Sequence, residues 1–363
     1  MDLMLVPDGG LAWLDASGPL ATVVLSTRIR LARNLAGETF AGRAQPDGRR
    51  RVLQRVEEAW QDAGYGRGGM RILLDELDQE ERRLLHERHL VSKELMASAA
   101  ERTGRSSTAV FLADGVGAMV NEEDHLRLQT LHSGFAPGAA YASLERLDEA
   151  LGTRLPYAFH REFGYLTACP TNAGTGLRAS VLIHLPGLVL TKEISKVLQG
   201  LAQVGLTFRG LYGEGSDVVG NFFQLSNQTT LGKSEDELLD HLGKIVRQVV
   251  AYEEQARQVL LRDAPTIIED KVWRAYGLLR FARSLSFEET MNLLSGVRLG
   301  VGLKLIPGLS VYTLNKLLVY TQPAHLAALE ARAPHDPELR AARAAYVRRA
   351  LENEPEGGTR GRP

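Results

Sequence analysis

The segment TAVFLADGVGAMVN, residues 108–121, is the clearest fold signal in this chain. Two short apolar runs flank Asp114-Gly115, and a two-residue Asp-Gly connection between such runs is a strong signal for a β-hairpin. Four further apolar runs are predicted to be strands: TVVLSTRIRLA (22–32), ASVLIHL (179–185), GLTFRGLYG (205–213) and NFFQLS (221–226). The first part of the chain is therefore predicted to contain a sheet.

Helical patterns surround these strands. Residues 49–62 carry apolar side chains at helical spacing. Ser-Glu-Asp-Glu at 234–237 is a capping box that opens an amphipathic run, and a second capping box lies at 286–289. Strand signals stop after about residue 260, and residues 269–283 and 337–351 favour helices. The sequence thus predicts a mixed α/β domain followed by an all-helical one.

Composition and charge exclude several classes of protein. The 363 residues have a formal net charge of −1, which gives no electrostatic reason to expect nucleic acid or an anionic membrane as partner. Cys169 is the only cysteine, which excludes an intramolecular disulfide and a thiolate metal cluster. The N-terminal residues lack a basic signal-peptide region, and no apolar run reaches the roughly 18 residues of a membrane helix. We therefore expect a cytoplasmic protein.

Two glycine-containing motifs are weak evidence for a site. Residues 228–234, QTTLGKS, end like a P-loop, but Asn227 stands where the first glycine is required, and no apolar strand leads into the loop in the right geometry. The glycines of residues 172–176 alone indicate only a turn. Neither motif by itself predicts a nucleotide site.

Arginines within apolar strands and beside turns are stronger evidence. Arg28 and Arg30 alternate along one predicted strand and so share a face. Arg127 follows an acidic segment, Arg178 follows the glycine turn, and Arg209 lies late in a strand. A single arginine of this kind would usually be a surface cation. Several together are different, because the planar guanidinium group donates two parallel hydrogen bonds to phosphate oxygens. The set of five therefore predicts a phosphate-binding site.

Acidic residues occur at the ends of two predicted strands. Asn-Glu-Glu-Asp-His at 121–125 places three carboxylates after the hairpin, and Glu214 follows the strand that carries Arg209. An isolated carboxylate in such a place is usually a helix cap or a surface charge. Beside phosphate-binding arginines, the two groups suggest a cationic acceptor next to a polyphosphate.

Four blocks of sequence, in the order of a known family, carry a resemblance. The blocks are STRIRLARN (26–34), NEEDHLR (121–127), CPTNAGTGLRAS (169–180) and RGLYGEGSDVVGNFFQLSNQTTLGKSE (209–235). They resemble the guanidino kinases, and within that family the bacterial protein arginine kinases, over about residues 22–350. The resemblance implies an α+β fold, an antiparallel sheet flanked by helices, followed by an all-helical C-terminal domain.

The order of the domains favours a kinase for proteins. In phosphagen kinases, which act on small guanidino compounds, a helical domain precedes the first block, whereas here only about 25 residues precede it. Without that domain the acceptor site should be open enough for a side chain on a protein. We expect an N-terminal extension at 1–21, a catalytic domain at 22–256, a helical regulatory and dimerisation domain at 260–352 and a disordered tail at 353–363.

The chemistry of the acceptor explains the acids that the resemblance singles out. An arginine guanidinium is protonated and its nitrogens are poor nucleophiles, so carboxylates must orient it and accept a proton. The resemblance implies that Glu123 and Glu214 are these catalytic acids. It also matches Cys169 to the family's reactive cysteine, whose thiolate would tune the acceptor rather than attack it.

On the donor side, the resemblance implies ATP, with Mg²⁺ held mainly by ATP and no metal site of His or Cys. Neutralising the transferring phosphoryl group is the main task of such a site. The implied ATP-contacting residues are Ser26, Thr27, Arg28, Ile29, Arg30, His89, Arg127, Arg178, Ala179, Ser180, Val181, Leu182, Arg209, Gly210, Leu211, Tyr212, Gly213 and Glu214.

The family also has a short C-terminal motif, R-D-x-x-R-A, that binds phosphoarginine and feeds back on activity. Residues 339–344, LRAARA, align with it, so that Leu339 and Arg340 replace its first two positions and Arg343 keeps its second arginine. Arg340 and Arg343 thus form a degenerate version of this site. We expect free phosphoarginine to leave the rate unchanged.

The sequence as a whole predicts an ATP-dependent kinase that phosphorylates arginine side chains in proteins. The resemblance implies a homodimer that marks proteins for a Clp-type unfoldase and protease, with a heat-shock repressor among its substrates. Two alternatives stay open: a kinase for free arginine or another small guanidino compound, and a non-catalytic adaptor that binds phosphoarginine.

Overall fold

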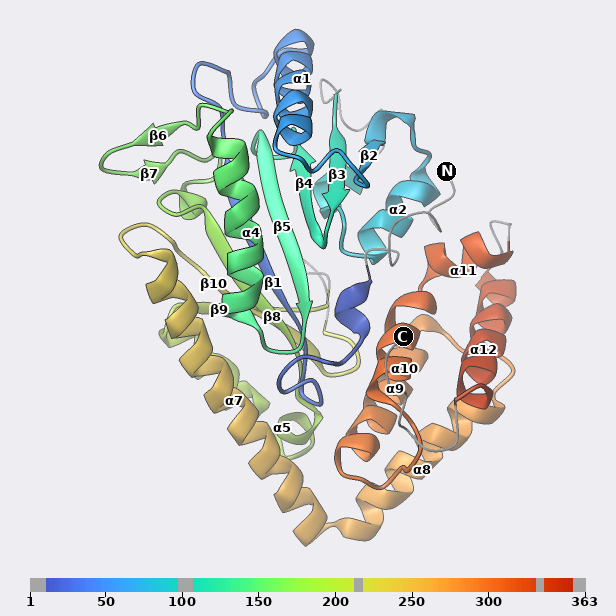
Figure 1. Ribbon diagram of the computed structural model, residues 1–363. Helices are drawn as coiled ribbons and strands as arrows, with labels where there is room; N and C mark the ends of the chain where they lie inside the picture. Colours follow the sequence, from blue (N-terminus) through green and yellow to red (C-terminus); the bar gives the residue numbers. More distant parts are fainter. Residues whose placement is uncertain (1–10, 97–106, 212–217, 331–335, 355–363) are drawn as a thin grey trace.

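The computed structural model describes residues 11–96, 107–211, 218–330 and 336–354. Within these ranges eight strands form one sheet with the order β2-β3-β4-β5-β1-β8-β10-β9, and every neighbouring pair is antiparallel (Figure 1). The strands are β1 (Val24–Arg33), β2 (Met70–Leu73), β3 (Ala109–Ala113), β4 (Val116–Val120), β5 (Leu126–Ser133), β8 (Leu177–His184), β9 (Leu206–Arg209) and β10 (Phe222–Asn227). The expectation of an antiparallel sheet is confirmed.

The predicted hairpin is formed by β3 and β4. Asp114 has φ +48° and Gly115 has φ +77°, the two positive values of a type I′ turn, whose twist matches that of the paired strands. A second, separate hairpin consists of β6 (Phe159–His160) and β7 (Gly164–Tyr165).

Alternation along the strands gives the sheet two different faces. On one face, apolar side chains such as Leu31, Ala179, Val181 and Leu225 join a single core with the helices that cover it. On the other face, the neighbouring positions along the same strands are polar or charged, as at Arg30 in β1. The sheet therefore has one mainly apolar side, which packs in the core, and one side on which polar and charged side chains gather.

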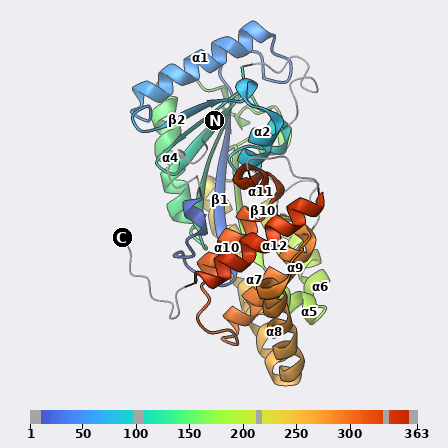
Figure 2. The same ribbon diagram turned by 90° about the vertical axis from the view of Figure 1, so that its right-hand side faces the viewer.

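Several helices cover the apolar face, among them α1 (Pro46–Asp62), α4 (Pro137–Gly152) and the first half of α7 (Glu235–Asp263). The opposite face carries the short helices α2 (Gln79–Glu87) and α3 (Lys93–Met96) near one edge, and Figure 2 shows the sheet lying between α4 and α2. The helices α5 (Pro186–Leu190) and α6 (Ile194–Gln203) connect β8 to β9. Ser234 of the P-loop-like segment is the N-cap of α7, and its hydroxyl accepts from the backbone N–H of Glu237.

The C-terminal region is helical. It consists of α8 (Pro265–Phe281), α9 (Phe287–Gly302), α10 (Val311–Tyr320), α11 (Pro323–Glu330) and α12 (Asp336–Glu352). Helices α7 and α8 diverge from one corner, and α11 lies beside α2 (Figure 1). The core of this region includes Leu25, Leu182 and Phe222 from the sheet, so the two parts pack directly against each other. The boundary that we expected between residues 256 and 260 falls within α7.

Both ends of the described chain pack against the helical region. Leu11, Trp13 and Leu14 form a small apolar cluster with Val319 of α10. Near the C-terminus, Glu354 accepts a hydrogen bond from the backbone N–H of Ser310, so the start of the tail that we expected to be disordered is in contact with the protein. Residues 355–363 lie outside the described ranges.

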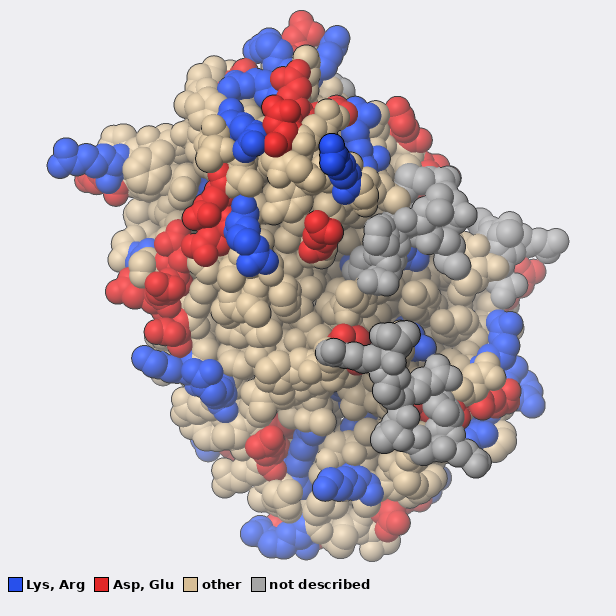
Figure 3. All heavy atoms as spheres, viewed as in Figure 1, with Lys and Arg blue, Asp and Glu red and all other residues tan. Residues whose placement is uncertain are grey.

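The surface carries charges of both signs. On the face shown in Figure 3, Lys and Arg side chains lie among Asp and Glu side chains, in keeping with a net charge of −1. Among the described helices, none combines the length and the apolar composition that a membrane-spanning segment needs.

Candidate active site

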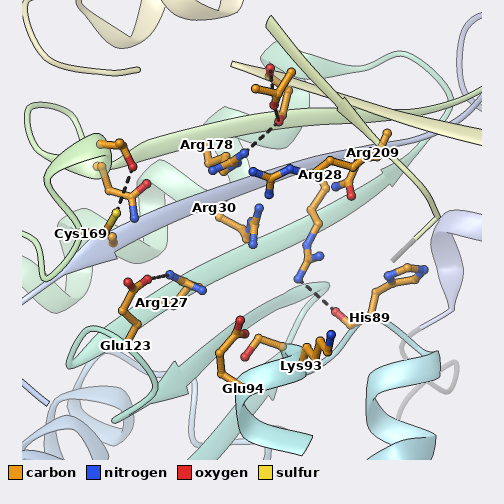
Figure 4. A pocket seen from close by; sticks show the side chains of 18 of the residues that line it. Arg28, Arg30, His89, Lys93, Glu94, Glu123, Arg127, Cys169, Arg178 and Arg209 are labelled. Carbon is orange, nitrogen blue, oxygen red and sulfur yellow. Dashed lines mark hydrogen bonds and ion pairs between the residues drawn. The ribbon is translucent and has the colours of Figure 1, made fainter. Parts of the chain in front are cut away.

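A cavity of about 430 Å³ opens on the polar face of the sheet. Strands β1, β5, β8, β9 and β10 form its floor, and the segments around α2, α3 and residues 169–176 form its walls (Figure 4). Its lining contains eight of the residues expected from the sequence: Arg28, Arg30, His89, Glu123, Arg127, Cys169, Arg178 and Arg209. Residues from five separate segments thus meet in one place.

The register of the sheet brings the arginines together. Arg30 in β1 lies directly opposite Arg178 in β8, and Arg127 lies opposite Ala32 on the other side of β1. Two like charges on directly opposed positions of an antiparallel pair destabilise a sheet. An arrangement of this kind is expected where a bound anion compensates the repulsion.

Burial strengthens this electrostatic argument. The Nε atoms of Arg28 and Arg30 are buried and have no hydrogen-bond partner among the described residues. Burial, followed by repulsion from Arg28, Arg127 and Arg178, holds the pKa of Arg30 well below its usual value. Burial and Arg127 lower the pKa of Arg28 to about 10. Nε donors without acceptors among the described residues, on cations that repel one another, fit a polyanionic ligand such as a triphosphate.

Glu123 is the member of the acidic segment 121–125 that faces the cavity. Its carboxylate accepts from Nη2 of Arg127 at 2.9 Å, while Nη1 of Arg127 donates to the buried Glu122 at 2.7 Å. Burial raises the pKa of Glu123 above its ordinary value although Arg127 opposes the shift. Glu123 is therefore a carboxylate with a raised proton affinity at the edge of the arginine cluster.

The neighbours of Glu123 serve to hold its loop. Asp124 accepts from Nδ2 of Asn34 at 2.6 Å and from the backbone N–H of Ala168 at 2.7 Å. His125 accepts at Nδ1 from the backbone N–H of Leu35. Because Ala168 directly precedes Cys169, the contact with Asp124 also fixes the segment that carries the thiol on the same side of the cavity (Figure 4).

The glycine turn after Cys169 packs closely against the backbone of neighbouring segments. A Cβ atom at Gly174 would lie 2.9 Å from Cα of Leu231, and one at Gly176 would lie 2.6 Å from the carbonyl oxygen of Ala32. Both glycines also have positive φ, +101° and +67°, which other residues adopt at a cost. Within this segment, Sγ of Cys169 lies 3.1 Å from Oγ1 of Thr171.

Other residues that the resemblance singled out do not line the cavity. The side chains of Ile29, Ala179 and Val181 belong to the core on the opposite face of the sheet, and Leu182 and Leu211 pack with the helical region. Ser26, Thr27, Ser180 and Gly210 are buried and are not part of its lining. Tyr212, Gly213 and Glu214 lie outside the described residues.

Several lining residues were not expected from the sequence. Gln224 and Ser226 alternate along β10, and Oγ of Ser226 accepts from Nη2 of Arg178 at 3.2 Å. Their signal was two polar residues at alternate positions of the apolar run NFFQLSN. Lys93 and Glu94 of α3 lie on the opposite wall (Figure 4), and nothing in their local sequence marks them.

The degenerate C-terminal motif has a structural role at Arg343. This side chain is 2% exposed, and its guanidinium donates to the carbonyl oxygens of Thr321, at 2.7 Å, and Leu285, at 2.9 Å. Arg340 is exposed, so the two arginines differ in environment. The contacts of Arg343 tie α12 to the ends of α10 and α9.

We expect Arg343→Ala to lower the free energy of unfolding by about 3 kcal/mol, because it leaves two carbonyls without a charged donor. Thermal unfolding of the variant measures this loss. Arg349→Ala, at an exposed position of the same helix, is the control and should change the free energy by less than about 0.5 kcal/mol. Equal unfolding temperatures for the two variants would contradict the structural role of Arg343.

The described residues contain no group of three or more His, Cys, Asp or Glu side chains that could hold a metal ion.

Comparisons with known proteins agree with this geometry. The family model "ATP:guanido phosphotransferase, C-terminal catalytic domain" matches residues 51–256, and the model "Protein-arginine kinase McsB C-terminal domain" matches residues 265–361. The protein-arginine kinase of Pelotomaculum thermopropionicum is 43% identical over 94% of this chain and 96% of its own length. The protein-arginine kinase of Symbiobacterium thermophilum is 45% identical over 93% of this chain and 96% of its own length.

Solved structures are similar as well. The duplicated taurocyamine kinase of Schistosoma mansoni, with bound transition state analog components, is 26% identical with a TM-score of 0.55, over 67% of this chain and 33% of that one. Lombricine kinase shows the same fold. It is 24% identical with a TM-score of 0.55, over 66% of this chain and 70% of that one. The chain therefore belongs to the ATP:guanido phosphotransferase family, and within it to the protein-arginine kinases.

Proposed function

We propose that this protein transfers the γ-phosphoryl group of ATP to arginine side chains of proteins. The observation that carries the proposal is the cavity itself, in which five arginines from four strands face a carboxylate and a thiol. The two relatives named above, which match nearly the whole chain, are both protein-arginine kinases.

The arginine cluster is the proposed binding site for the triphosphate. Arg28 and Arg30 offer buried Nε donors that have no partner among the described residues, and Arg127, Arg178 and Arg209 border the same space. Each guanidinium group can donate two parallel hydrogen bonds to phosphate oxygens. These bonds hold the γ-phosphorus in position for in-line attack, and the positive charge neutralises the phosphate oxygens. Mg²⁺, held mainly by ATP, would further withdraw charge from the phosphate oxygens.

Glu123 is the proposed base on the acceptor side. A guanidino nitrogen forms a bond to the γ-phosphorus, the bond to the β–γ bridging oxygen breaks to release ADP, and the guanidinium proton passes to the Glu123 carboxylate. The raised pKa of Glu123 makes it a better proton acceptor than an exposed glutamate. We assign Glu214 as the second acid and Cys169 as a nearby sulfur that tunes the acceptor rather than attacking it.

The pH dependence of the rate follows from this assignment. A base must be ionised, so kcat/KM falls when the pH drops below the pKa of Glu123. Because burial raises that pKa, the acid limb should lie above the pH range of an ordinary glutamate. The measurement is the pH profile of kcat/KM for wild type and Glu123→Gln. An acid limb that is unchanged in the variant would exclude Glu123 as its source.

One experiment separates the proposed acceptor from a small guanidino compound. The protein is incubated with ATP and either free L-arginine or an unfolded protein rich in arginine, and acid-labile phosphate is measured. Phosphate on the protein is the expected result. Phosphate on free arginine alone would overturn the proposal in favour of a phosphagen-type kinase.

The wider role is proposed on the resemblance. It includes a division into a catalytic domain at 22–256 and a helical regulatory and dimerisation domain at 260–352, and a homodimer in the cytoplasm. The phosphorylated proteins would pass to a Clp-type unfoldase and protease, and a heat-shock repressor would be among them.

A further inference from the structure

Three consecutive residues at the end of α2 connect the helical C-terminal region to the cavity. Glu87 and Arg88 contact α11, whereas His89 lines the cavity. Figure 2 shows α11 next to α2, although the two helices are separated by more than 200 residues of sequence. The connection is built from buried polar groups at the contact between α2 and α11.

Glu87 holds the start of α11. Its carboxylate is buried and accepts from the backbone N–H groups of Ala324, at 2.9 Å, and His325, at 3.1 Å. It also accepts from Nδ1 of His325 at 2.8 Å. A carboxylate at the first free N–H groups of a helix satisfies donors that have no partner within the helix.

The contacts of His325 define its protonation state. Because a carboxylate only accepts, Nδ1 carries the proton toward Glu87. Because an arginine only donates, Nε2 accepts from Nε of Arg88, at 3.1 Å. Burial also lowers the pKa of His325. The ring is therefore neutral and bridges Glu87 and Arg88 through both nitrogens.

The next residue, His89, turns the chain toward the cavity. It has φ +60°, and the bonds from His89 N–H to the His86 carbonyl and from Leu90 N–H to the Leu85 carbonyl close α2 with a Schellman motif. This position usually holds glycine, so surrounding contacts must maintain it. One is a T-shaped contact with the Trp13 ring, whose centre lies 5.6 Å from the centre of the His89 ring, and Trp13 itself packs on Val319 of α10.

The turn fixes the orientation of Arg28. The carbonyl oxygens of His89 and Leu90 accept from Nε2 of Gln129, at 3.1 and 3.2 Å. With its nitrogen held there, the amide of Gln129 must present Oε1 to Nη2 of Arg28, which donates to it. Nη2 of Arg28 also lies 3.5 Å from the His89 carbonyl oxygen. A chain of directed contacts thus runs from His325 to Arg28.

We propose that His325 is a positioning residue for nucleotide binding: by clamping Glu87 and Arg88 it holds the turn at His89, and through Gln129 it orients the guanidinium of Arg28 toward the triphosphate. This inference rests on the proposed ATP site. It gives the helical region a defined part in binding the nucleotide, through residues other than Arg340 and Arg343.

The test is the dissociation constant of ATP, measured by calorimetry. We expect His325→Leu, which removes both ring contacts, to raise it about tenfold, within the usual range for coupling between distant groups. His325→Asn, whose amide can still donate to Glu87, should recover most of the affinity. Val347→Ala, a buried truncation in α12, is the control for general loosening and should leave the constant unchanged.

A double-mutant cycle with Arg28→Ala tests the route. If His325 acts through Arg28, His325→Leu should change the dissociation constant less than twofold once Arg28 is replaced. Full additivity, or an unchanged constant in His325→Leu alone, would overturn the inference while leaving the proposed function intact. A wild-type protein that binds no ATP would overturn the proposed function as well.

Discussion

Glu123→Gln is expected to lower kcat by a factor of about 10³, because the amide cannot accept the guanidinium proton. The dissociation constant of ATP should change little, since Glu123 lies on the acceptor side of the arginine cluster. Single-turnover measurements with an unfolded protein substrate, over a range of ATP concentrations up to saturation, separate the two quantities. Near-normal turnover in the variant would remove Glu123 from the catalytic role.

Glu122→Gln provides the matched control. Both glutamates accept from Arg127, but Glu122 is fully buried and does not line the cavity. Its replacement should lower the unfolding temperature and weaken ATP binding through Arg127, with a change in kcat of less than tenfold. A loss of kcat as large as that of Glu123→Gln would show that Arg127, rather than the base, is the common cause.

Arg30→Met is expected to weaken ATP use about a hundredfold in kcat/KM while making the nucleotide-free protein more stable. The first effect follows from the loss of charge-assisted bonds to phosphate, worth roughly 3 kcal/mol. The second follows because Arg30 is a partly buried cation opposite Arg178, and its replacement by an apolar side chain should raise the free energy of unfolding by about 1–2 kcal/mol.

Arg33→Met, in the same strand, should behave in the opposite way. Arg33 is 2% exposed, and its Nη2 lies 2.6 Å from Asp148. Removing it leaves a largely buried carboxylate unpaired, which should lower the free energy of unfolding by about 3 kcal/mol. Thermal unfolding without nucleotide compares the two variants. A destabilised Arg30→Met protein would contradict the view that the arginine cluster is strained until an anion binds.

Short sequence motifs correctly predicted those turns and helix starts that depend only on residues close in the chain. The hairpin at Asp114-Gly115 and the capping boxes at Ser234 and Ser286 depend on contacts within a few residues, and all three are confirmed. The strand at 126–133 was not predicted. Its sequence LRLQTLHS mixes polar and apolar residues because Arg127 and Gln129 face the cavity and its surroundings.

Contacts between distant residues limited the prediction of the site. The alternation of Arg28 and Arg30 placed both on one face, and the structure confirms that both line one cavity. The sequence could not show that Arg33, three residues later, would instead pair with Asp148. For the same reason the buried role of Arg343 and the bridge from Glu87 to His325 had no local signal.

The central claim is that this chain phosphorylates guanidino nitrogens of protein arginines with a base at Glu123. Mass-spectrometric mapping of an unfolded protein after incubation with ATP tests it most directly, with wild type and Glu123→Gln side by side. The account predicts phosphate on arginine residues with wild type and almost none with the variant. Phosphate on serine, threonine or tyrosine, or equal phosphoarginine with both proteins, would contradict it.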